Sequence, residues 1–465
     1  MSKIKIAYLP FYIKLYDDSN VSREPMYSYM KTLISMIESQ GFEVVLPDAS
    51  LCRIKEEFDA AAAKFNADPE IVAVVTQHIA YSPALESIEA LKSLKAPIIV
   101  FDTTPDYKVV SVANYYDAID PNHGIHGVQD MCNLLNRNHV PFQMVAGHAF
   151  HSDVVAELCG KLRAAAAAKF YKNEKVGMVG KHFEGMGDFL ISDERYKADI
   201  GCDVVSFNKE LCEKYMAKVT DEEIAAEIES DYDNYDVKIK NRGDYEVETR
   251  TGLAVRKWME DEKLDAVTIN FLHCDEDGLP AMPFVECGKI LGRGTGYAGE
   301  GDTLTAGLVG ALLKFYPDTT FTEMFNPDWE QNKILMNHMG EINPRLTKWP
   351  ARIVGRKWGY NSCQDTAAMI GCYRAGSAVL VNLAPLDEGY NLILTQVEMT
   401  DDGLLDGAYA HSVQGWMKPP MNLPEYLKAY SKVGGTHHSA LVYNGDIAEL
   451  ASFGEFMGFN TIIIK

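Results

Sequence analysis

The segment from Gly294 to Leu313, GTGYAGEGDTLTAGLVGALL, holds the densest group of residues that could do chemistry. Glycines surround the carboxylates of Glu300 and Asp302, and leucines recur at helical spacing after Thr303. Glycine lets a backbone approach a ligand closely. The segment lacks the lysine of a GxxxxGK[ST] phosphate loop, which argues against a phosphate cradle. Two interpretations fit: a turn that presents carboxylates to a ligand, or a helix N-terminus with acidic capping residues.

Other residues of ligand type follow further along the chain. They are Glu323 in FTEMF, His338 in MNHMG, and the pair His437–His438 in GGTHHSALVY. Together with Glu300, two carboxylates and two imidazoles could bind a divalent cation. A mixed oxygen and nitrogen set suits Mn²⁺, Co²⁺ or Mg²⁺ better than a thiolate-type zinc site. No two of these residues form a local motif such as HExxH, so spacing alone does not assemble them. Taken singly, each also fits an ordinary surface or core residue.

The secondary-structure elements that must position these side chains start with alternating strands and helices in the first part of the chain. Residues 4–9 read as a buried strand, and residues 26–39 read as a helix. The β-branched runs IVAVVT (71–76) and PIIVF (97–101) are typical of parallel sheets, and residues 153–170 contain an alanine-rich helix. This alternation predicts a doubly wound α/β domain.

A second α/β unit begins with KVGMVG at residue 175. It includes expected strands at 203–207 and 266–272, and a long helix at 246–263. The charge-rich stretch 227–250 has mixed signs, so we expect a solvated helix face and loop.

The last third of the chain changes character. The runs AVLVNL (378–383) and YNLILTQVE (390–398) are β-rich, and helices are expected at 424–433 and 447–457. The predicted fold is therefore α/β: two doubly wound α/β domains followed by a mainly antiparallel, β-barrel-like C-terminal domain. The predicted boundaries are 1–170, 171–318 and 319–465.

Composition narrows the class of partner. The chain has 465 residues, of which 47% are hydrophobic, enough for two or three domains. A net charge of −22 argues against nucleic acid or an anionic membrane, but not against a neutral sugar. No signal peptide or membrane-spanning run is visible, and the nine cysteines form no CxxC pair. We expect a cytoplasmic protein with reduced thiols.

Several segments, in order along nearly the whole chain, resemble the L-arabinose isomerase/L-fucose isomerase family. Gly296–Thr305 is similar to the GYGFAGEGDWKTA segment of L-arabinose isomerases. The surroundings of Glu323 resemble their FMEDYTYHFE stretch, His338 matches the histidine of their HMLE, and His437–His438 match their GAHHT. Upstream, DPNHGIHG (120–127) is similar to their N-x-x-x-HGG segment.

This resemblance implies a metal-dependent aldose–ketose isomerase. It implies that a divalent metal, usually Mn²⁺, is held by Glu300, Glu323, His338 and His438. Glu300 and Glu323 are implied to be the acid/base pair. His437 matches a neighbour that is not a ligand, and we expect it near the sugar.

The resemblance also implies a homo-hexamer with sites at subunit boundaries. His126 is implied to reach the site of a neighbouring subunit. His78, in TQHIAYSP, matches a position near the opening of the site, where it would contact the substrate or simply pack.

The implied chemistry moves a proton between two sugar carbons through an enediolate, which a metal and two carboxylates would support. A hydride shift is compatible with the same residues. The chain departs from the family at LPFYIKLYD (9–17) and FLHCDEDGLP (271–280), loops that shape the sugar pocket. The substrate is therefore left as a pentose, 6-deoxyhexose or C6-modified hexose. The alternatives are a metal-dependent epimerase or aldolase and a non-enzymatic sugar-binding protein.

Overall fold

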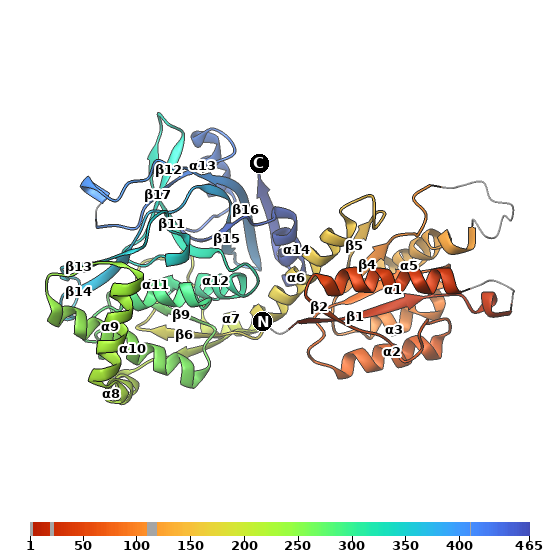
Figure 1. The fold of residues 1–465 in the computed structure, drawn as a ribbon, viewed down its shortest axis with the longest axis horizontal. Helices are drawn as coiled ribbons and strands as arrows, with labels where there is room; N and C mark the ends of the chain where they lie inside the picture. Colours follow the sequence, from red (N-terminus) through yellow and green to blue (C-terminus); the bar gives the residue numbers. More distant parts are fainter. Residues whose placement is uncertain (1–2, 19–22, 109–118, 410) are drawn as a thin grey trace. The chain divides into compact units, whose positions relative to one another are not determined.

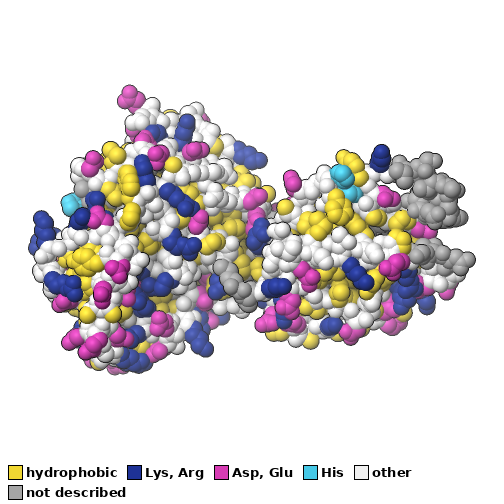
Figure 2. Space-filling view, viewed as in Figure 1, with side chains coloured by type: hydrophobic (Ala, Val, Ile, Leu, Met, Phe, Trp, Pro, Cys, Tyr) yellow, Lys and Arg dark blue, Asp and Glu magenta, His cyan; other side chains and the backbone are white. Residues whose placement is uncertain are grey.

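Residues 3–18, 23–108, 119–409 and 411–465 are described by the structure, which is a computed structural model (Figure 1). The chain divides into unit 1, residues 1–166, and unit 2, residues 167–465. Acidic and basic side chains are interspersed over the visible surface of both units (Figure 2). Among the described residues, no helix combines the length and apolar composition needed to cross a bilayer. All nine cysteines are free thiols, and most are buried.

Unit 1 is built on a five-stranded parallel sheet of order β2-β1-β3-β4-β5. Its elements in chain order are β1 (Ile4–Phe11), η1 (Lys14–Asp18), α1 (Glu24–Ser39), β2 (Phe42–Val45), α2 (Lys55–Ala67), β3 (Val74–His78), η2 (Ala84–Glu86), α3 (Ile88–Lys92), β4 (Ile98–Asp102), η3 (Asp120–Asn122), α5 (Ile125–Arg137), β5 (Phe142–Ala146) and α6 (Val154–Tyr171), within which the unit boundary falls.

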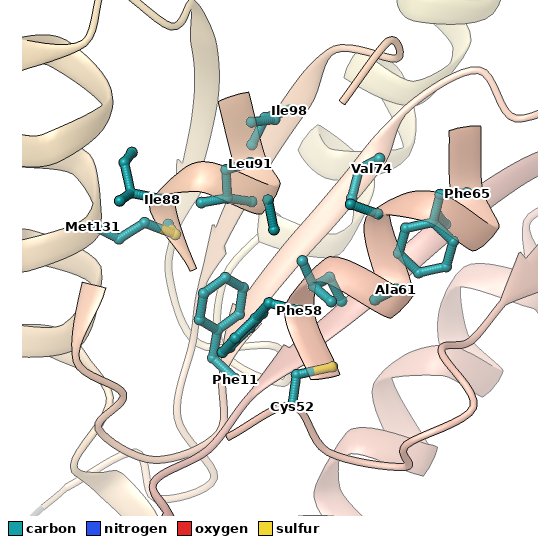
Figure 3. Packing of buried hydrophobic residues seen from close by; sticks show 14 of the residues in the cluster. Phe11, Cys52, Phe58, Ala61, Phe65, Val74, Ile88, Leu91, Ile98 and Met131 are labelled. Carbon is teal, nitrogen blue, oxygen red and sulfur yellow. The ribbon is translucent and has the colours of Figure 1, made fainter. Parts of the chain in front are cut away.

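One hydrophobic core of unit 1 lies between this sheet and the helices α2, α3 and α5. Helix α2 carries Phe58, Ala61 and Phe65 at helical spacing, so all three point to one side. Figure 3 shows Phe58 beside Phe11 of β1, with Ala61 and Phe65 further along the helix; the rings of Phe11 and Phe58 have centroids 4.8 Å apart. The strands are buried because helices flank the parallel sheet, as their near-continuous apolar runs predict.

Unit 2 begins with a four-stranded parallel sheet of order β10-β9-β6-β7. The elements of this part are β6 (Lys175–Val179), α7 (Asp193–Asp199), β7 (Asp203–Ser206), α8 (Lys209–Lys218), α9 (Asp221–Asn234), β8 (Asp236–Lys238), α10 (Arg242–Glu262), β9 (Ala266–Ile269), α11 (Phe284–Arg293), β10 (Gly296–Gly299) and α12 (Thr303–Phe315). Helix α12 is buried along almost its whole length, because it packs against this sheet and also against the barrel strands that follow.

The C-terminal part of unit 2 is a closed antiparallel barrel. Its ring runs β15-β18-β11-β12-β17-β16 and closes through β15–β16 pairing. The elements are β11 (Thr319–Asp328), β12 (Lys333–Asn337), η4 (Pro344–Leu346), β13 (Arg352–Arg356), β14 (Thr366–Ile370), β15 (Gly376–Pro385), β16 (Tyr390–Met399), η5 (Gly407–Tyr409), β17 (Gly415–Lys418), α13 (Leu423–Lys432), β18 (His438–Tyr443), α14 (Ile447–Met457) and β19 (Asn460–Ile464). Strand β19 joins β16 in parallel, and β14-β13-β8 form a separate small sheet. The predicted fold class is confirmed.

The charge-rich stretch 227–250 is less solvated than its composition predicted. Asp231 and Glu248 are each only 1% exposed, on helices α9 and α10. Lys289 of α11 makes ion pairs with Asp231 and with Glu227. The helices keep a solvated outer face, and packing of α9, α10 and α11 buries charges on the inner face, such as Asp231 and Lys289, which pair with one another.

Candidate active site

The turn between β10 and α12 holds Glu300 in a left-handed conformation, with φ of 66°. A non-glycine residue in this region is strained, and such strain is concentrated at functional sites. The loop after β6 fixes the turn, because Phe183 N donates to the Glu300 carbonyl over 3.1 Å. At Gly301 (φ 78°), a side chain would collide with the Lys181 carbonyl oxygen, so the sequence must have glycine here. The Glu300 carboxylate lies at the carboxyl edge of the parallel sheet, where α/β folds bind ligands.

His438, the first residue of β18, is completely buried beside this turn. Its Nδ1 lies 2.9 Å from Asp302 Oδ2, and since a carboxylate only accepts, the imidazole donates from Nδ1. The ring stacks on Phe189 at 5.1 Å. Its Nε2 is thereby left as the acceptor; it lies 3.5 Å from Glu300 Oε2 and has no hydrogen-bond partner in the described chain.

His338 follows β12 and repeats this arrangement. Its Nδ1 lies 2.7 Å from Oε1 of Glu341, a fully buried carboxylate that also accepts from Tyr297 OH. The other nitrogen, Nε2, lies 4.0 Å from Glu323 Oε2. Gly299 leaves room for the ring, because a Cβ there would lie 2.8 Å from His338 Cε1.

Strand register brings Glu323 into this group. On β11, Glu323 pairs across the sheet with His438 on one side and with Asn337, the neighbour of His338, on the other. Its side chain is 21% exposed, so it borders the open side of the site. The barrel thus places one carboxylate and two imidazoles together: Glu323 on β11, His438 at the start of β18 and His338 directly after β12.

His437 forms a third carboxylate–imidazole pair. Both its backbone N and its Nδ1 donate to Oδ2 of Asp188, over 2.9 and 2.6 Å, while its Nε2 lies 3.5 Å from Glu300 Oε2. Burial alone would lower the pKa of His437, but Asp188 and Glu300 raise it to about 10. Burial acts in the opposite sense on Asp188, yet the bonds from His437 lower its pKa to about 2.

The convergent atoms form a centre fit for a cation. The ligand atoms of Glu323, His338 and His438 lie within 4.8 Å of one another, and so do those of Glu300, His437 and His438. In both His338 and His438, a buried carboxylate holds Nδ1 and Nε2 faces another carboxylate. Proteins use this arrangement for histidines that bind metals.

The two carboxylates at the centre have different environments. Burial would raise the pKa of Glu300, but the hydrogen bond with His437 and the nearby His438 hold it below its usual value. Burial raises the pKa of Glu323 in spite of the opposing effect of His338. Paired carboxylates with separated pKa values can divide acid and base roles between them.

Comparisons with known proteins find relatives along nearly the whole chain. Models of the N-terminal, central and C-terminal domains of L-arabinose isomerase match residues 24–223, 194–316 and 318–460. The L-arabinose isomerase of Oceanobacillus iheyensis is 25% identical over 438 residues, covering 91% of this chain and 90% of the relative. That of Clostridium beijerinckii is 26% identical over 414 residues, covering 86% and 82%. The chain belongs to the L-arabinose isomerase family. It is thus an aldose–ketose isomerase.

The structure gathers five of the residues singled out from the sequence and from the resemblance to L-arabinose isomerases. They are Glu300, Glu323, His338, His437 and His438, all in unit 2. The structure confirms the helix-cap interpretation of the glycine-rich segment, because Asp302 accepts from Thr305 N at the start of α12; Asp302 also accepts from His438. That the turn presents carboxylates to a ligand stays a prediction.

The two remaining residues, His126 and His78, belong to unit 1. The ring of His126 on α5 lies 4.1 Å from Tyr81 and 4.1 Å from His123, centroid to centroid. His78 ends β3, stacks on Phe11 at 4.4 Å and is 4% exposed. Burial, with a smaller effect of His126, lowers the pKa of His78 to about 3. The roles assigned to these two residues stay predictions.

Sequence reasoning missed three residues that support the imidazoles in this member of the L-arabinose isomerase family. Glu341 lies three positions after His338, so an HxxE spacing was available as a signal. Asp188 lies 249 positions before His437, and Phe189 is next to it, so no local pattern pointed to either.

Proposed function

We propose that this chain is a metal-dependent ketol isomerase that interconverts a free aldose and its ketose through an enediolate. The observation that carries the proposal is the buried Nε2 of His438, which Asp302 orients toward Glu300 and which lacks a protein hydrogen-bond partner in the described residues. An unpartnered buried nitrogen is costly unless something binds it.

The donor set fits a divalent cation. Glu300, Glu323, His338 and His438 would hold it, with two oxygen and two nitrogen donors of the kind that Mn²⁺ and Co²⁺ accept. Asp302 and Glu341 would keep both imidazoles in the tautomer that leaves Nε2 free for a ligand. When bound, the cation supplies positive charge that lowers the energy of an enediolate.

The chain's own groups account for the proton transfers. Isomerisation requires one group to take the proton from a sugar carbon and another to transfer protons to and from the sugar oxygens. Glu300 and Glu323 face the same centre from the parallel sheet and from the barrel, so they can act from two sides of a sugar. His437, held by Asp188 and partly exposed, lies beside Glu300 and can donate to a sugar hydroxyl.

Further parts of the proposal follow from the family resemblance. L-arabinose is the first substrate to test because the relatives are named for it, and a 6-deoxyhexose or C6-modified hexose comes next. We propose Mn²⁺ as the resident ion, a homo-hexamer to which His126 contributes at a neighbouring subunit's site, and a cytoplasmic location.

The test is an aldose–ketose conversion assay. Protein stripped with chelator is supplied with Mn²⁺, incubated with L-arabinose and the other sugars, and analysed for ketose. Ketose formed only with added metal, and absent from Glu323→Gln, supports the proposal. Same-carbonyl or cleaved products would instead identify an epimerase or aldolase. Bound metal without conversion of any sugar would refute the ketol isomerase.

A further inference from the structure

A cavity of about 440 Å³ opens in unit 2 between β8, β13 and the start of α10. That volume is in the range of small-molecule pockets. Its lining contains five cationic side chains, namely Lys238, Lys240, Arg352, Arg356 and Lys357, against the two acidic residues Asp244 and Asp365. Figure 2 shows Lys and Arg side chains next to a histidine at the left margin of unit 2, on the side where Figure 1 labels β13. For a chain of net charge −22, such a concentration of cations is a local exception.

Carboxylates of the protein neutralise only some of these cationic side chains. Lys238 and Arg352 both pair with Asp236, and Lys357 pairs with Asp365. Arg356 and Lys240 have no carboxylate partner in the described part of the chain, and Asp244 forms no ion pair there to offset them. The pocket therefore keeps uncompensated positive charge.

Arg356 is the anchor of this group. It is half-buried, packs 5.6 Å from the Phe284 ring and donates one hydrogen bond to the His411 carbonyl. Burial lowers its pKa, against the effect of Glu341. The Glu341 carboxylate is already engaged by His338 and Tyr297, so it does not serve Arg356 as a hydrogen-bonded partner. A partly desolvated guanidinium with no carboxylate hydrogen-bonded to it is costly, and an anion in the pocket would reduce that cost.

The chemistry of the lining selects the class of anion. A guanidinium presents a planar fork that matches phosphate oxygens, and a lysine adds a mobile point charge. The pocket also contains Asn241, the N-cap of the 21-residue helix α10, whose positive end favours anions. We propose that this pocket binds a small phosphate-bearing metabolite through Arg356 and Lys240. None of the residues proposed as metal ligands or as the acid/base pair lines this pocket, and the phosphate proposal does not depend on the isomerase proposal.

Binding of inorganic phosphate to the full chain tests this site. Isothermal titration with phosphate, against chloride at equal ionic strength, is compared for the unmodified chain and the variants Lys240→Ala and Arg356→Gln. Each variant should weaken phosphate binding about tenfold, as expected for loss of a charge-assisted bond. Lys240 is exposed, and its side chain makes no ion pair or hydrogen bond within the described residues, so Lys240→Ala should fold even if Arg356→Gln does not.

The matched control is Lys428→Ala, which removes an exposed lysine of α13 that is not part of the pocket. It should leave phosphate affinity unchanged. No phosphate binding beyond the chloride baseline would overturn the proposal. So would binding that Lys240→Ala leaves at full strength, or that Lys428→Ala weakens equally.

Discussion

The substitution Asp302→Asn separates metal binding from folding. Asp302 makes two bonds of similar length: Oδ1 accepts from Thr305 N over 2.8 Å, and Oδ2 accepts from His438 Nδ1 over 2.9 Å. Asparagine has the same shape, and its one oxygen can keep the helix cap. Its amide nitrogen would then face Nδ1, which must become an acceptor to keep a hydrogen bond.

This reversal moves the imidazole proton to Nε2, the atom that lies 3.5 Å from Glu300. A protonated Nε2 cannot bind a metal. Loss of such a supporting carboxylate typically weakens metal binding about 10- to 100-fold, which is about 1.4–2.8 kcal/mol. Because the helix cap is kept, the free energy of unfolding should change much less than it would if a buried hydrogen-bond partner were removed.

The assay is a titration of chelator-stripped protein with Mn²⁺, followed by the electron paramagnetic resonance signal of free Mn²⁺. Asp446→Asn is the matched control, because Asp446 is also an N-cap carboxylate, bonded to Ala448 N and Glu449 N of α14. It should bind Mn²⁺ like the unmodified chain. If Asp302→Asn binds Mn²⁺ with unchanged affinity, the orientation of His438 by Asp302 does not matter for the metal, and the reasoning fails.

Three further predictions concern other carboxylates. Glu300→Gln and Glu323→Gln should each lower kcat about 10²- to 10⁴-fold without loss of the folded circular dichroism spectrum, and near-normal kcat in either would remove it from the acid/base pair. Asp188→Ala should lower kcat/KM about tenfold because it releases His437. Asp188→Asn should keep most of kcat/KM, because its single amide oxygen can accept both hydrogen bonds from His437. Equal losses in the two variants would show that the charge of Asp188, rather than the position of His437, matters. Glu174 is buried, and neither of its carboxylate oxygens has a partner in the described chain. Burial raises its pKa well above the usual value. Above the pKa of the unfolded state, the free energy of unfolding therefore falls by about 1.4 kcal/mol per pH unit until the pKa of the folded state is reached. Glu174→Gln should therefore gain stability relative to the unmodified chain between pH 5 and pH 8 in urea unfolding, and an equal difference at both pH values would contradict this.

Local patterns in the sequence were enough for the fold class. Apolar runs such as those of β3 and β4 predicted parallel strands, because a strand buried on both faces must be apolar on both. The alternation of strands and helices predicted the α/β layers, and the β-rich last third predicted the barrel. These features depend on residues that are close in sequence, which one segment can encode by itself.

The sequence also supplied the residue types of the proposed metal site and, by resemblance to L-arabinose isomerases, which residues to propose as ligands. What it did not contain was the geometry around them. Only the register of β11 against β18 places Glu323 opposite His438, and a shift of one residue would turn the Glu323 side chain to the other face of its strand.

The partners of the imidazoles were decided by tertiary structure alone. Asp302 and His438 are 136 positions apart, and Asp188 and His437 are 249 apart. The pocket around Arg356 likewise joins segments that start near residues 238 and 352. Periodicity determines which face of an element is apolar, but not which distant elements pack together. That choice depends on the free energy of the whole packed chain, so the polar contacts between those elements appear only when it has folded.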